Sequence, residues 1–397
     1  MSAPAAPWPL AGVTVVGLEQ AVAAPLATRQ LADLGARVIK VERPGVGDFA
    51  RHYDQAVLGS SSYFVWLNRS KESLSLDLKS PGGLEVLGRL LERADVLVQN
   101  LAPGAAARLG LDGATVRSRW PRLVPCAISG YGSDGPWAAR KAYDLLVQGE
   151  AGLLSVTGTP EEPARAGISV ADIAAGMYAF SGILAALYLR ATSGTVCPVD
   201  TSLFDALGEW MGAPALFTDG SGHEPGRTGA QHATIAPYGP FTSRDGVTII
   251  VAVQNQREWA SFCSVFLAEP GLAADPRFAS NSARVAHRSE LNERVARGFA
   301  ELDAADAVDL LERAGVATAR LNTMAEFLGH PVLAAGRWRQ VMTPGGPVRA
   351  LAPPLRLGGF QPRMGPVPTV GQHTDAILAE LGYDRRRIAE LRAAGAV

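Results

Sequence analysis

The chain has few cysteines and almost no net charge, and both features argue against several classes of protein. Its 397 residues include three cysteines, Cys126, Cys197 and Cys263, and none belongs to a CxxC pair. So sparse and odd a number argues against a disulfide framework and against a cysteine-rich zinc site. The net charge of −1 lacks the basic excess that is typical of nucleic-acid-binding proteins. We therefore expect a globular protein of a reducing compartment, with no metal and no nucleic-acid partner.

Targeting and membrane signals are also weak. The beginning MSAPAAPWPLAG has no basic region followed by an apolar stretch, so we expect no signal peptide and a cytoplasmic protein. One apolar run, Ile173–Leu189, has a length near the short limit for crossing a membrane. It contains Gly176, Ser181 and Gly182, and we favour a buried core helix or a dimer helix over a membrane span.

The N-terminal third alternates between short β-branched runs and helical spacing, which predicts βαβ units and a parallel sheet. The predicted strands end near Gly17, Glu42, Asn100 and Ser129. No GxGxxG or GxxxxGK[ST] motif follows the first of them, so a dinucleotide site and a P-loop lack their main support. We predict an α/β protein that binds its ligand at the carboxyl ends of the strands. The length favours two domains or one elaborated domain.

Two carboxylates begin otherwise apolar segments. Asp144 opens DLLVQG, and Asp172 precedes the apolar run that starts at Ile173. An Asp in such a place is usually a helix cap, because its carboxylate accepts N–H bonds from the first turn. The helix dipole favours the ionised form, so we expect Asp172 to be a carboxylate at neutral pH. Such a group beside a cleft can also act as a nucleophile, and the spacing alone leaves both roles open.

Basic residues recur just beyond the predicted strands. Singly, each is most simply a solvated surface charge. Together they suggest an anionic ligand that carries phosphates. They are Lys40, Arg43, Arg51, Arg69, Lys71, Arg108 and Lys141.

An ordered series of segments resembles the class III CoA-transferase family, also called CaiB/BaiF. The series includes LADLGARVIKVERPGVGDFAR, LNRSKESLSLDLKSPGG, ADVLVQNLAPGAAARLGL, YDLLVQGEAGL, ISVADIAAGMYA and the ending GQHTDAILAELGY. The resemblance implies a large Rossmann-like domain with a parallel sheet, a smaller inserted α+β domain and an interlocked homodimer. The expected boundaries are 1–218 for the first part of the large domain, 219–239 for a Gly-rich linker or lid, 240–335 for the small domain and 336–397 for the segment that completes the large domain.

The resemblance also implies site residues. Asp172 matches the nucleophilic aspartate, which would form a mixed anhydride with the donor acyl group and then an aspartyl-CoA thioester. The match places Arg43, Arg108 and Lys141 at CoA-contacting positions and includes Lys71 more weakly. The backbone of Ala21–Pro25, Ala23 among it, is a candidate for lining the site. CoA would enter as a thioester substrate, with no permanently bound cofactor.

Two departures from the family pattern limit what can be carried over. Some members have a Gln in the early loop where this chain has Val22, with Gln20 two residues away, and some have an aromatic residue where this chain has Leu101. The racemase branch of the superfamily uses a His immediately before the position of Asp144, and here that residue is Tyr143. A racemase needs two acid–base groups around the α-carbon, so transfer is favoured over racemisation. Asp144 remains either a hydrogen-bonding partner in the site or a helix start.

The second half resembles the subgroup that acts on C4–C5 dicarboxylates more than the formyl-CoA/oxalate or carnitine branches. We rank intramolecular C1–C4 transfer in mesaconyl-CoA narrowly ahead of intermolecular transfer from succinyl-CoA to itaconate or citramalate. Candidate anchors for a distal carboxylate are Arg227, His232 and Arg257.

Overall fold

The computed structural model describes residues 8–397 and divides into two compact units. The expectation of no signal peptide concerns the beginning of the chain, and residues 1–7 lie outside the described part. The large unit comprises Met1–Ala151, Gly167–Met211 and Val332–Val397, and the small unit comprises Gly152–Ala166 and Gly212–Pro331.

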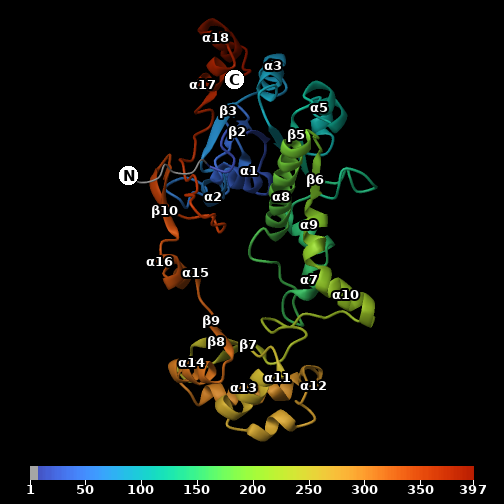
Figure 1. Cartoon of the computed structure of the whole chain (residues 1–397), viewed down its shortest axis with the longest axis vertical. Coiled ribbons are helices and arrows are strands. Elements are labelled where there is room, and N and C mark those ends of the chain that lie inside the picture. Colours follow the sequence, from blue (N-terminus) through green and yellow to red (C-terminus); the bar gives the residue numbers. More distant parts are fainter. Residues whose placement is uncertain (1–7) are drawn as a thin grey trace. The chain divides into compact units, whose positions relative to one another are not determined.

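A parallel sheet is the centre of the large unit, as the βαβ pattern predicts (Figure 1). Within the described residues it has six strands in the order β3-β2-β1-β4-β5-β6. The inner strands are almost completely buried because helices cover them, which explains their continuous apolar sequences. The strands are β1 Thr14–Leu18, β2 Arg37–Glu42, β3 Lys71–Ser75, β4 Val96–Gln99, β5 Val124–Ser129 and β6 Val199–Ser202.

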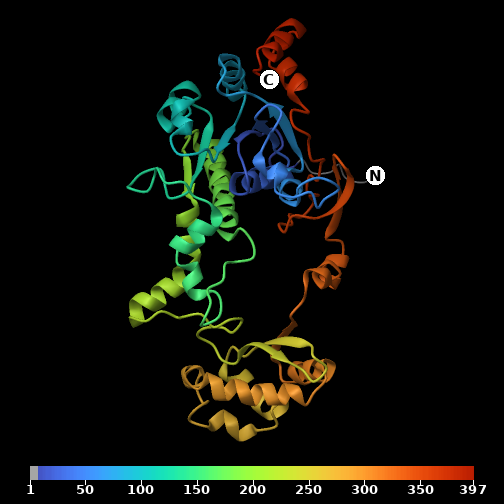
Figure 2. The ribbon, with the colours of Figure 1, turned by 180° about the vertical axis from the view of Figure 1, so that it is seen from behind.

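Two helices of the large unit pack closely against each other, α1 (Ala23–Asp33) and α8 (Val170–Ser193). Both ribbon views show the green α8 running beside the blue α1 (Figures 1 and 2). Their closest approach depends on Gly176, where an added Cβ would stand 2.6 Å from the carbonyl oxygen of Ala23. By length and composition α8 passes as a membrane span, but it also packs against β5, β6 and α9 (Leu203–Trp210). Half of its apolar window is buried, as in a core helix.

The C-terminal segment of the chain returns to the large unit. Ile377, Leu378 and Leu391 belong to the same buried cluster as Val86 and Leu87 of α3. The remaining elements of this unit are η1 Phe49–His52, α2 Ser62–Asn68, α3 Pro81–Leu91, α4 Ala105–Arg108, α5 Gly113–Arg119, α6 Asp144–Glu150, β10 Trp338–Thr343, β11 Gly346–Leu351, α17 Thr374–Glu380 and α18 Arg385–Ala393. The short α16 (Pro331–Ala334) lies at the unit boundary.

The small unit contains an antiparallel sheet ordered β7-β8-β9, whose β7–β8 hairpin turns at Asp245-Gly246, an Asp-Gly pair typical of such turns. Trp259, Phe262 and Phe299 lie in its buried core. Its elements are α7 Leu153–Val156, α10 Gly212–Ser221, β7 Tyr238–Thr242, β8 Thr248–Ala252, α11 Gln256–Ser261, η2 Phe262–Phe266, η3 Pro270–Ala274, α12 Asn281–Ala286, α13 Arg288–Ala300, α14 Ala304–Arg313, β9 Ala317–Arg320 and α15 Met324–Leu328.

The boundaries of the units differ from the expected ones, since residues 212–218 lie in the small unit and residues 332–335 lie in the large unit. Residues 152–166 were expected in the large domain but belong to the small unit. Residues 152–166 contact a distant part of the small unit. In particular, the backbone N–H of Gly229 donates to the carbonyl of Gly158 at 2.8 Å. The expected linker also begins within a helix, since α10 continues to Ser221.

Gly176→Ala should destabilise the protein because the new methyl group meets a backbone carbonyl that cannot move aside. We expect a loss of about 1–3 kcal/mol in the free energy of unfolding. The matched control is Gly88→Ala in α3, where only the far end of the Arg119 side chain lies within 4 Å. This control should gain roughly 0.5–1 kcal/mol from helix propensity. Urea denaturation measures the free energy of unfolding of both variants. Equal changes in the two variants would contradict the close α1–α8 contact at Gly176.

Candidate active site

Asp144 and Asp172 meet at the start of α8, but only Asp144 acts as a cap. Its Oδ1 accepts hydrogen bonds from the backbone N–H of Ala171 at 2.8 Å and of Asp172 at 3.2 Å. Asp144 is the first residue of α6, so its side chain satisfies N–H groups of the first turn of a different helix, α8. The N-cap position of α8 is Ser169, whose side chain makes no capping bond. Asp172 lies within the first turn, and its interpretation as an N-cap is therefore wrong.

The charge state of Asp172 also differs from the expectation. Burial, followed by the negative charge of Asp144, raises the pKa of Asp172 to about 7. These effects outweigh the helix dipole, so the prediction of a fully ionised carboxylate at neutral pH is corrected. A half-buried carboxyl group that titrates near neutrality, with a second carboxylate beside it, is typical of a catalytic position.

Two tyrosines accompany this pair. Tyr143 precedes α6 and leaves 66% of its surface exposed. Burial raises the pKa of Tyr53 to about 12, with further contributions from the charges of Asp48 and Asp172. Its phenol is therefore a neutral O–H donor that senses the Asp172 carboxylate. Sequence reasoning missed Tyr53, although it stands two residues after the GDFAR segment that the family resemblance uses.

The loop after β1 lies where the strand order reverses, between β1 and β4. The N–H of Gln20 donates to Oδ1 of Asn100 at 2.9 Å, and Nδ2 of Asn100 donates back to the carbonyl of Gln20 at 2.9 Å. In open α/β sheets this switch point is where ligands bind. The buried Ala23 begins α1 directly beyond the loop, and α1 leads to the contact with Gly176 on α8.

The structure separates the basic residues into two groups. Arg43 after β2, Arg108 at the end of α4 and Lys141 before α6 are exposed, as a phosphate-binding residue must be. The other four have internal partners: Lys40 with Asp48, Arg51 with Glu42, Arg69 with Asp33 and Lys71 with Glu19.

Lys71 is therefore misplaced for the predicted contact with CoA. Its ammonium is fully buried and donates to Glu19 at 2.7 Å, to the carbonyl of Pro25 at 3.0 Å and to Asn68 at 3.1 Å. These bonds occupy all three of its N–H donors. The expectation is corrected: Lys71 has a structural position inside β3.

Arg227 and His232 belong to the small unit. The guanidinium of Arg227 donates to the carbonyls of Thr159 and Pro160, both at 2.8 Å, and the ring of His232 stacks on Tyr238 with centroids 5.1 Å apart. These contacts fix both side chains locally, and their contact with substrate stays a prediction.

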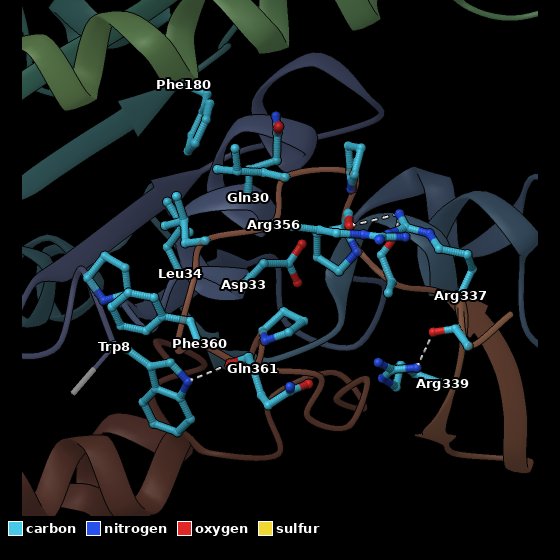
Figure 3. Close-up of a pocket in the computed structure, with 18 of the residues that line it drawn as sticks. Trp8, Gln30, Asp33, Leu34, Phe180, Arg337, Arg339, Arg356, Phe360 and Gln361 are labelled. Atoms are coloured by element: carbon cyan, nitrogen blue, oxygen red, sulfur yellow. Dashed lines mark hydrogen bonds between the residues drawn. The ribbon is translucent and has the colours of Figure 1, made fainter. Parts of the chain in front are cut away.

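A cavity of about 560 Å³ lies elsewhere in the large unit (Figure 3). Its wall includes Gln30, Phe180 and Arg356, and one hydrogen bond joins the Trp8 indole to the carbonyl of Gln361 at 3.0 Å. None of the predicted site residues lines it. Among residues 8–397, no group of three or more His, Cys, Asp or Glu side chains is arranged to hold a metal ion.

Comparison with known proteins agrees with this fold and identifies the family. The model of CoA-transferase family III matches residues 10–374. The chain is 34% identical to a human succinyl-CoA:glutarate CoA-transferase, over 98% of this chain and 90% of that protein. It is also 34% identical to an acetyl-CoA:oxalate CoA-transferase of Acetobacter aceti, over 89% of this chain and 90% of that protein. A crystal structure of a CaiB/BaiF family protein from Brucella suis superposes with a TM-score of 0.81 at 35% identity, covering 94% of this chain and 99% of that one.

The chain is therefore an enzyme of the class III CoA-transferase family, the class whose substrates are CoA thioesters.

Asp172→Asn should make the protein more stable than the wild type at alkaline pH. The folded-state pKa of Asp172 is raised above 3.8, so the native state binds an extra proton and loses stability as pH rises from about 4 to 7. The neutral amide avoids this loss, which we expect to be on the order of 2 kcal/mol after allowing for partial exposure. Urea denaturation near pH 5 and near pH 8 measures the gap in free energy of unfolding between the variant and the wild type. A gap that does not widen with pH would contradict the raised pKa.

Proposed function

We propose that this enzyme transfers CoA between small dicarboxylic acids, with Asp172 as the nucleophile that carries the acyl group and then CoA. The observation that carries the proposal is the Asp172 carboxyl group itself. It is half-buried, it titrates near pH 7 because of burial and Asp144, and it matches the family's nucleophile. A thioester is a good acyl donor, and a positioned carboxylate in a shielded site can attack it.

The proposed reaction has four steps. The Asp172 carboxylate attacks the donor thioester and expels CoA thiolate, which leaves a mixed anhydride. The thiolate attacks the Asp172 carbonyl carbon and releases the donor acid, which leaves an aspartyl-CoA thioester. The acceptor carboxylate then attacks this thioester and expels CoA thiolate again. Finally the thiolate attacks the acceptor carbonyl carbon, forms the new CoA thioester and restores the Asp172 carboxylate.

Each step places negative charge on an acyl oxygen, so fixed hydrogen-bond donors should accelerate it. Tyr53 is the proposed donor, because burial and the charges of Asp48 and Asp172 raise the pKa of its phenol to about 12 and keep it protonated. Burial and, after it, the negative charge of Asp144 keep the pKa of Asp172 high, which makes its carboxylate a stronger nucleophile. The exposed Arg43, Arg108 and Lys141 have the charge and exposure needed to contact the CoA phosphates.

For the substrates, we propose a succinyl-CoA type of donor and a C4–C5 dicarboxylate acceptor. The relative named for succinyl-CoA and glutarate supports this class, since both acids are dicarboxylates of that size. The relative named for oxalate is as similar in identity, so oxalate belongs among the acceptors to be tested. Arg227 and His232 remain the proposed anchors for the distal carboxylate.

A homodimer is part of the proposal. The large unit exposes many large apolar side chains on and near α6, α8 and α9, among them Tyr188 with 72% of its surface exposed. Such a surface is typical of one covered by a second copy. Sedimentation velocity distinguishes the dimer from a monomer. The side chains are Tyr143, Leu145, Leu146, Met177, Tyr178, Tyr188, Leu189, Phe204 and Trp210.

Asp172→Ala should abolish CoA transfer, a fall of at least about 10⁴-fold, because no other side chain carries the covalent intermediate. The variant should still fold and still bind acyl-CoA. Mass spectrometry of the wild type after incubation with succinyl-CoA should find a hydroxylamine-sensitive adduct that is missing from the variant. Asp309→Ala, at an exposed position of α14, is the control that should retain activity. Full activity of Asp172→Ala would contradict the covalent mechanism.

The choice of substrate can be tested with a panel of dicarboxylates. Succinyl-CoA is offered with glutarate, itaconate, citramalate and oxalate, and mesaconyl-C1-CoA is offered alone. We expect intermolecular transfer to a C4–C5 acid. A C4 thioester formed from mesaconyl-C1-CoA without acceptor would instead show intramolecular transfer. Deuterium exchange at the α-carbon of a 2-methylacyl-CoA, without CoA transfer, would show a racemase.

A further inference from the structure

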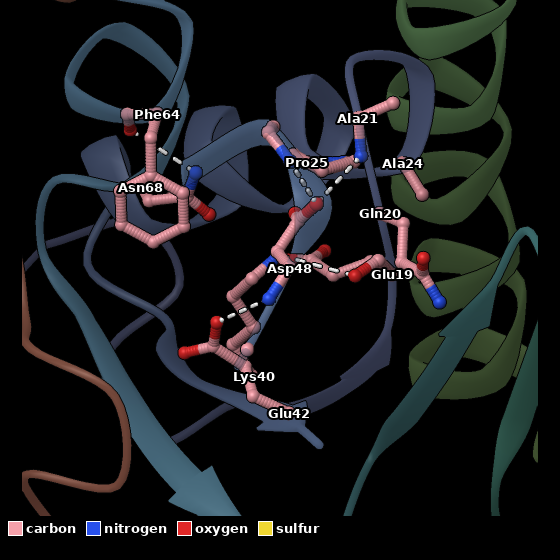
Figure 4. Close-up of polar contacts among 12 residues, drawn as sticks. Glu19, Gln20, Ala21, Ala24, Pro25, Lys40, Glu42, Asp48, Phe64 and Asn68 are labelled. Carbon is pink, nitrogen blue, oxygen red and sulfur yellow. Dashed lines mark hydrogen bonds and ion pairs between the residues drawn. The ribbon is translucent and has the colours of Figure 1, made fainter. Parts of the chain in front are cut away.

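A buried network of charged side chains lies under the turn that joins β1 to α1 (Figure 4). The ammonium of Lys40 is fully buried and contacts Oδ2 of Asp48 at 2.8 Å, Oε1 of Glu19 at 3.4 Å and the carbonyl of Glu19 at 3.1 Å. The same Oε1 accepts a bond from Lys71 at 2.7 Å. Burying charges is costly unless they are paired, so the network must do more than fill space. Lys40 and Asp48 both belong to the KVERPGVGD segment, and neither has a part in the proposed reaction steps.

Asp48 connects this network to two pieces of backbone. Its Oδ1 accepts one bond from the N–H of Ala21 at 3.2 Å and another from the N–H of Ala50 at 2.9 Å. The first bond fixes the turn before α1, and the second caps η1, which leads to Tyr53. The N–H of Asp48 donates to Glu42 at 3.0 Å, which holds Asp48 itself in place. Figure 4 shows the Asp48 carboxylate between Lys40 and the backbone of Ala21.

The turn that Asp48 holds has an unfavourable backbone conformation. Ala21 has φ of 61°, in the left-handed region that a residue with a Cβ rarely adopts. Without an external bond the turn would relax to another conformation. The Asp48 acceptor and the two bonds between Gln20 and Asn100 are the contacts that keep it in place. Strain of this kind is concentrated at functional sites.

Both pieces of backbone lie against the site of Asp172. Ala21 and Ile173, the residue after Asp172, pack on the same small cluster formed by Val22, Leu26 and Leu67. One helical turn beyond Asp172, Gly176 approaches the carbonyl of Ala23. Tyr53, the residue after η1, meets the ring of Tyr63 edge-on with centroids 5.5 Å apart, and Tyr63 packs on the same cluster as Ile173.

We propose that Asp48, held by Lys40, is a positioning residue for the reaction at Asp172. It fixes the strained Gln20–Ala21 turn and the η1–Tyr53 segment in the one arrangement that surrounds the Asp172 carboxylate. This inference rests on the proposed CoA transfer. A displacement of about 1 Å in such surroundings lowers turnover by as much as roughly 100-fold, although Asp48 touches no reacting atom.

The test compares two buried carboxylates that form similar ion pairs. Asp48→Asn removes the charge that Lys40 holds and weakens the bond to Ala21. Asp33→Asn removes the charge that Arg69 holds at the other end of α1. In the wild type the Arg69 guanidinium donates two hydrogen bonds to the Asp33 carboxylate, at 2.9 and 2.7 Å. Both variants should lower the melting temperature. Only Asp48→Asn should also lower kcat, about 10- to 100-fold, with KM for succinyl-CoA changed less than about threefold.

A second substitution separates positioning from stability. Glycine adopts the left-handed region without strain, so Ala21→Gly needs less support from Asp48. Added to Asp48→Asn, it should restore kcat by several-fold, whereas added to Asp33→Asn it should give no comparable gain in kcat. Loss of melting temperature in Asp48→Asn without loss of kcat would overturn the proposal, and so would the absence of any rescue.

Hydrogen exchange of residues 19–26 tests the same idea without activity. These amides should exchange faster in Asp48→Asn than in Asp33→Asn, and equal rates would overturn the positioning role. Absence of Asp172-dependent transfer in the wild type, together with the expected exchange pattern, would mean that the proposed function fails and the turn-holding role stands.

Discussion

The packing of α8 against α1 is the constraint on which the candidate site depends. Gly176 allows the two helices to approach until the carbonyl of Ala23 fills the space of a side chain. Asp172 lies one turn earlier on α8, and the residue after it, Ile173, packs on the same cluster as Ala21 of the turn after β1. In the parallel sheet ordered 3-2-1-4-5-6 this turn lies at the switch point between β1 and β4, where ligands bind in such sheets, and Asp172 is the proposed reactive group beside it.

Electrostatics then determines what the carboxylate can do. Asp144 satisfies the backbone N–H groups at the start of α8, which leaves the Asp172 side chain free of a capping role. The same negative charge, added to burial, raises the pKa of Asp172 to about 7. One residue therefore both holds the start of α8 and contributes to the raised pKa of the carboxyl group that we propose as the nucleophile. The buried ions around Lys40 act on backbone geometry, because Asp48 also accepts bonds from the N–H groups of Ala21 and Ala50.

Much of the fold could be predicted from the sequence because its signals are local. The β-branched runs that end near Gly17, Glu42, Asn100 and Ser129 became β1, β2, β4 and β5. The hairpin at Asp245-Gly246 followed from its turn residues. Assignment of residues 152–166 failed because it depends on contacts with a distant segment, such as that between Gly158 and Gly229.

The site was predictable only in part, for a similar reason. Residue type and family resemblance selected Asp172 and Asp144, which the structure brings together, and Arg43, Arg108 and Lys141, which it leaves exposed; their roles in the site stay predictions. Neither could show that Lys71 is buried against Glu19, because a strand sequence does not reveal which face meets an acidic partner. The raised pKa of Asp172 was missed because burial and the charge of a residue 28 positions away outweigh the local helix dipole.

The most direct test follows the oxygen atoms of the acceptor. In the proposed steps, the acceptor carboxylate leaves one of its oxygens on the Asp172 carboxylate when the second anhydride is cleaved. Trypsin releases residues 166–190 as one peptide, in which Asp172 is the only acidic side chain. After turnover with an acceptor labelled with heavy oxygen in its carboxylates, mass spectrometry should find the label in this peptide at Asp172. Continued turnover with no label at Asp172 would contradict the role of this carboxylate as the nucleophile.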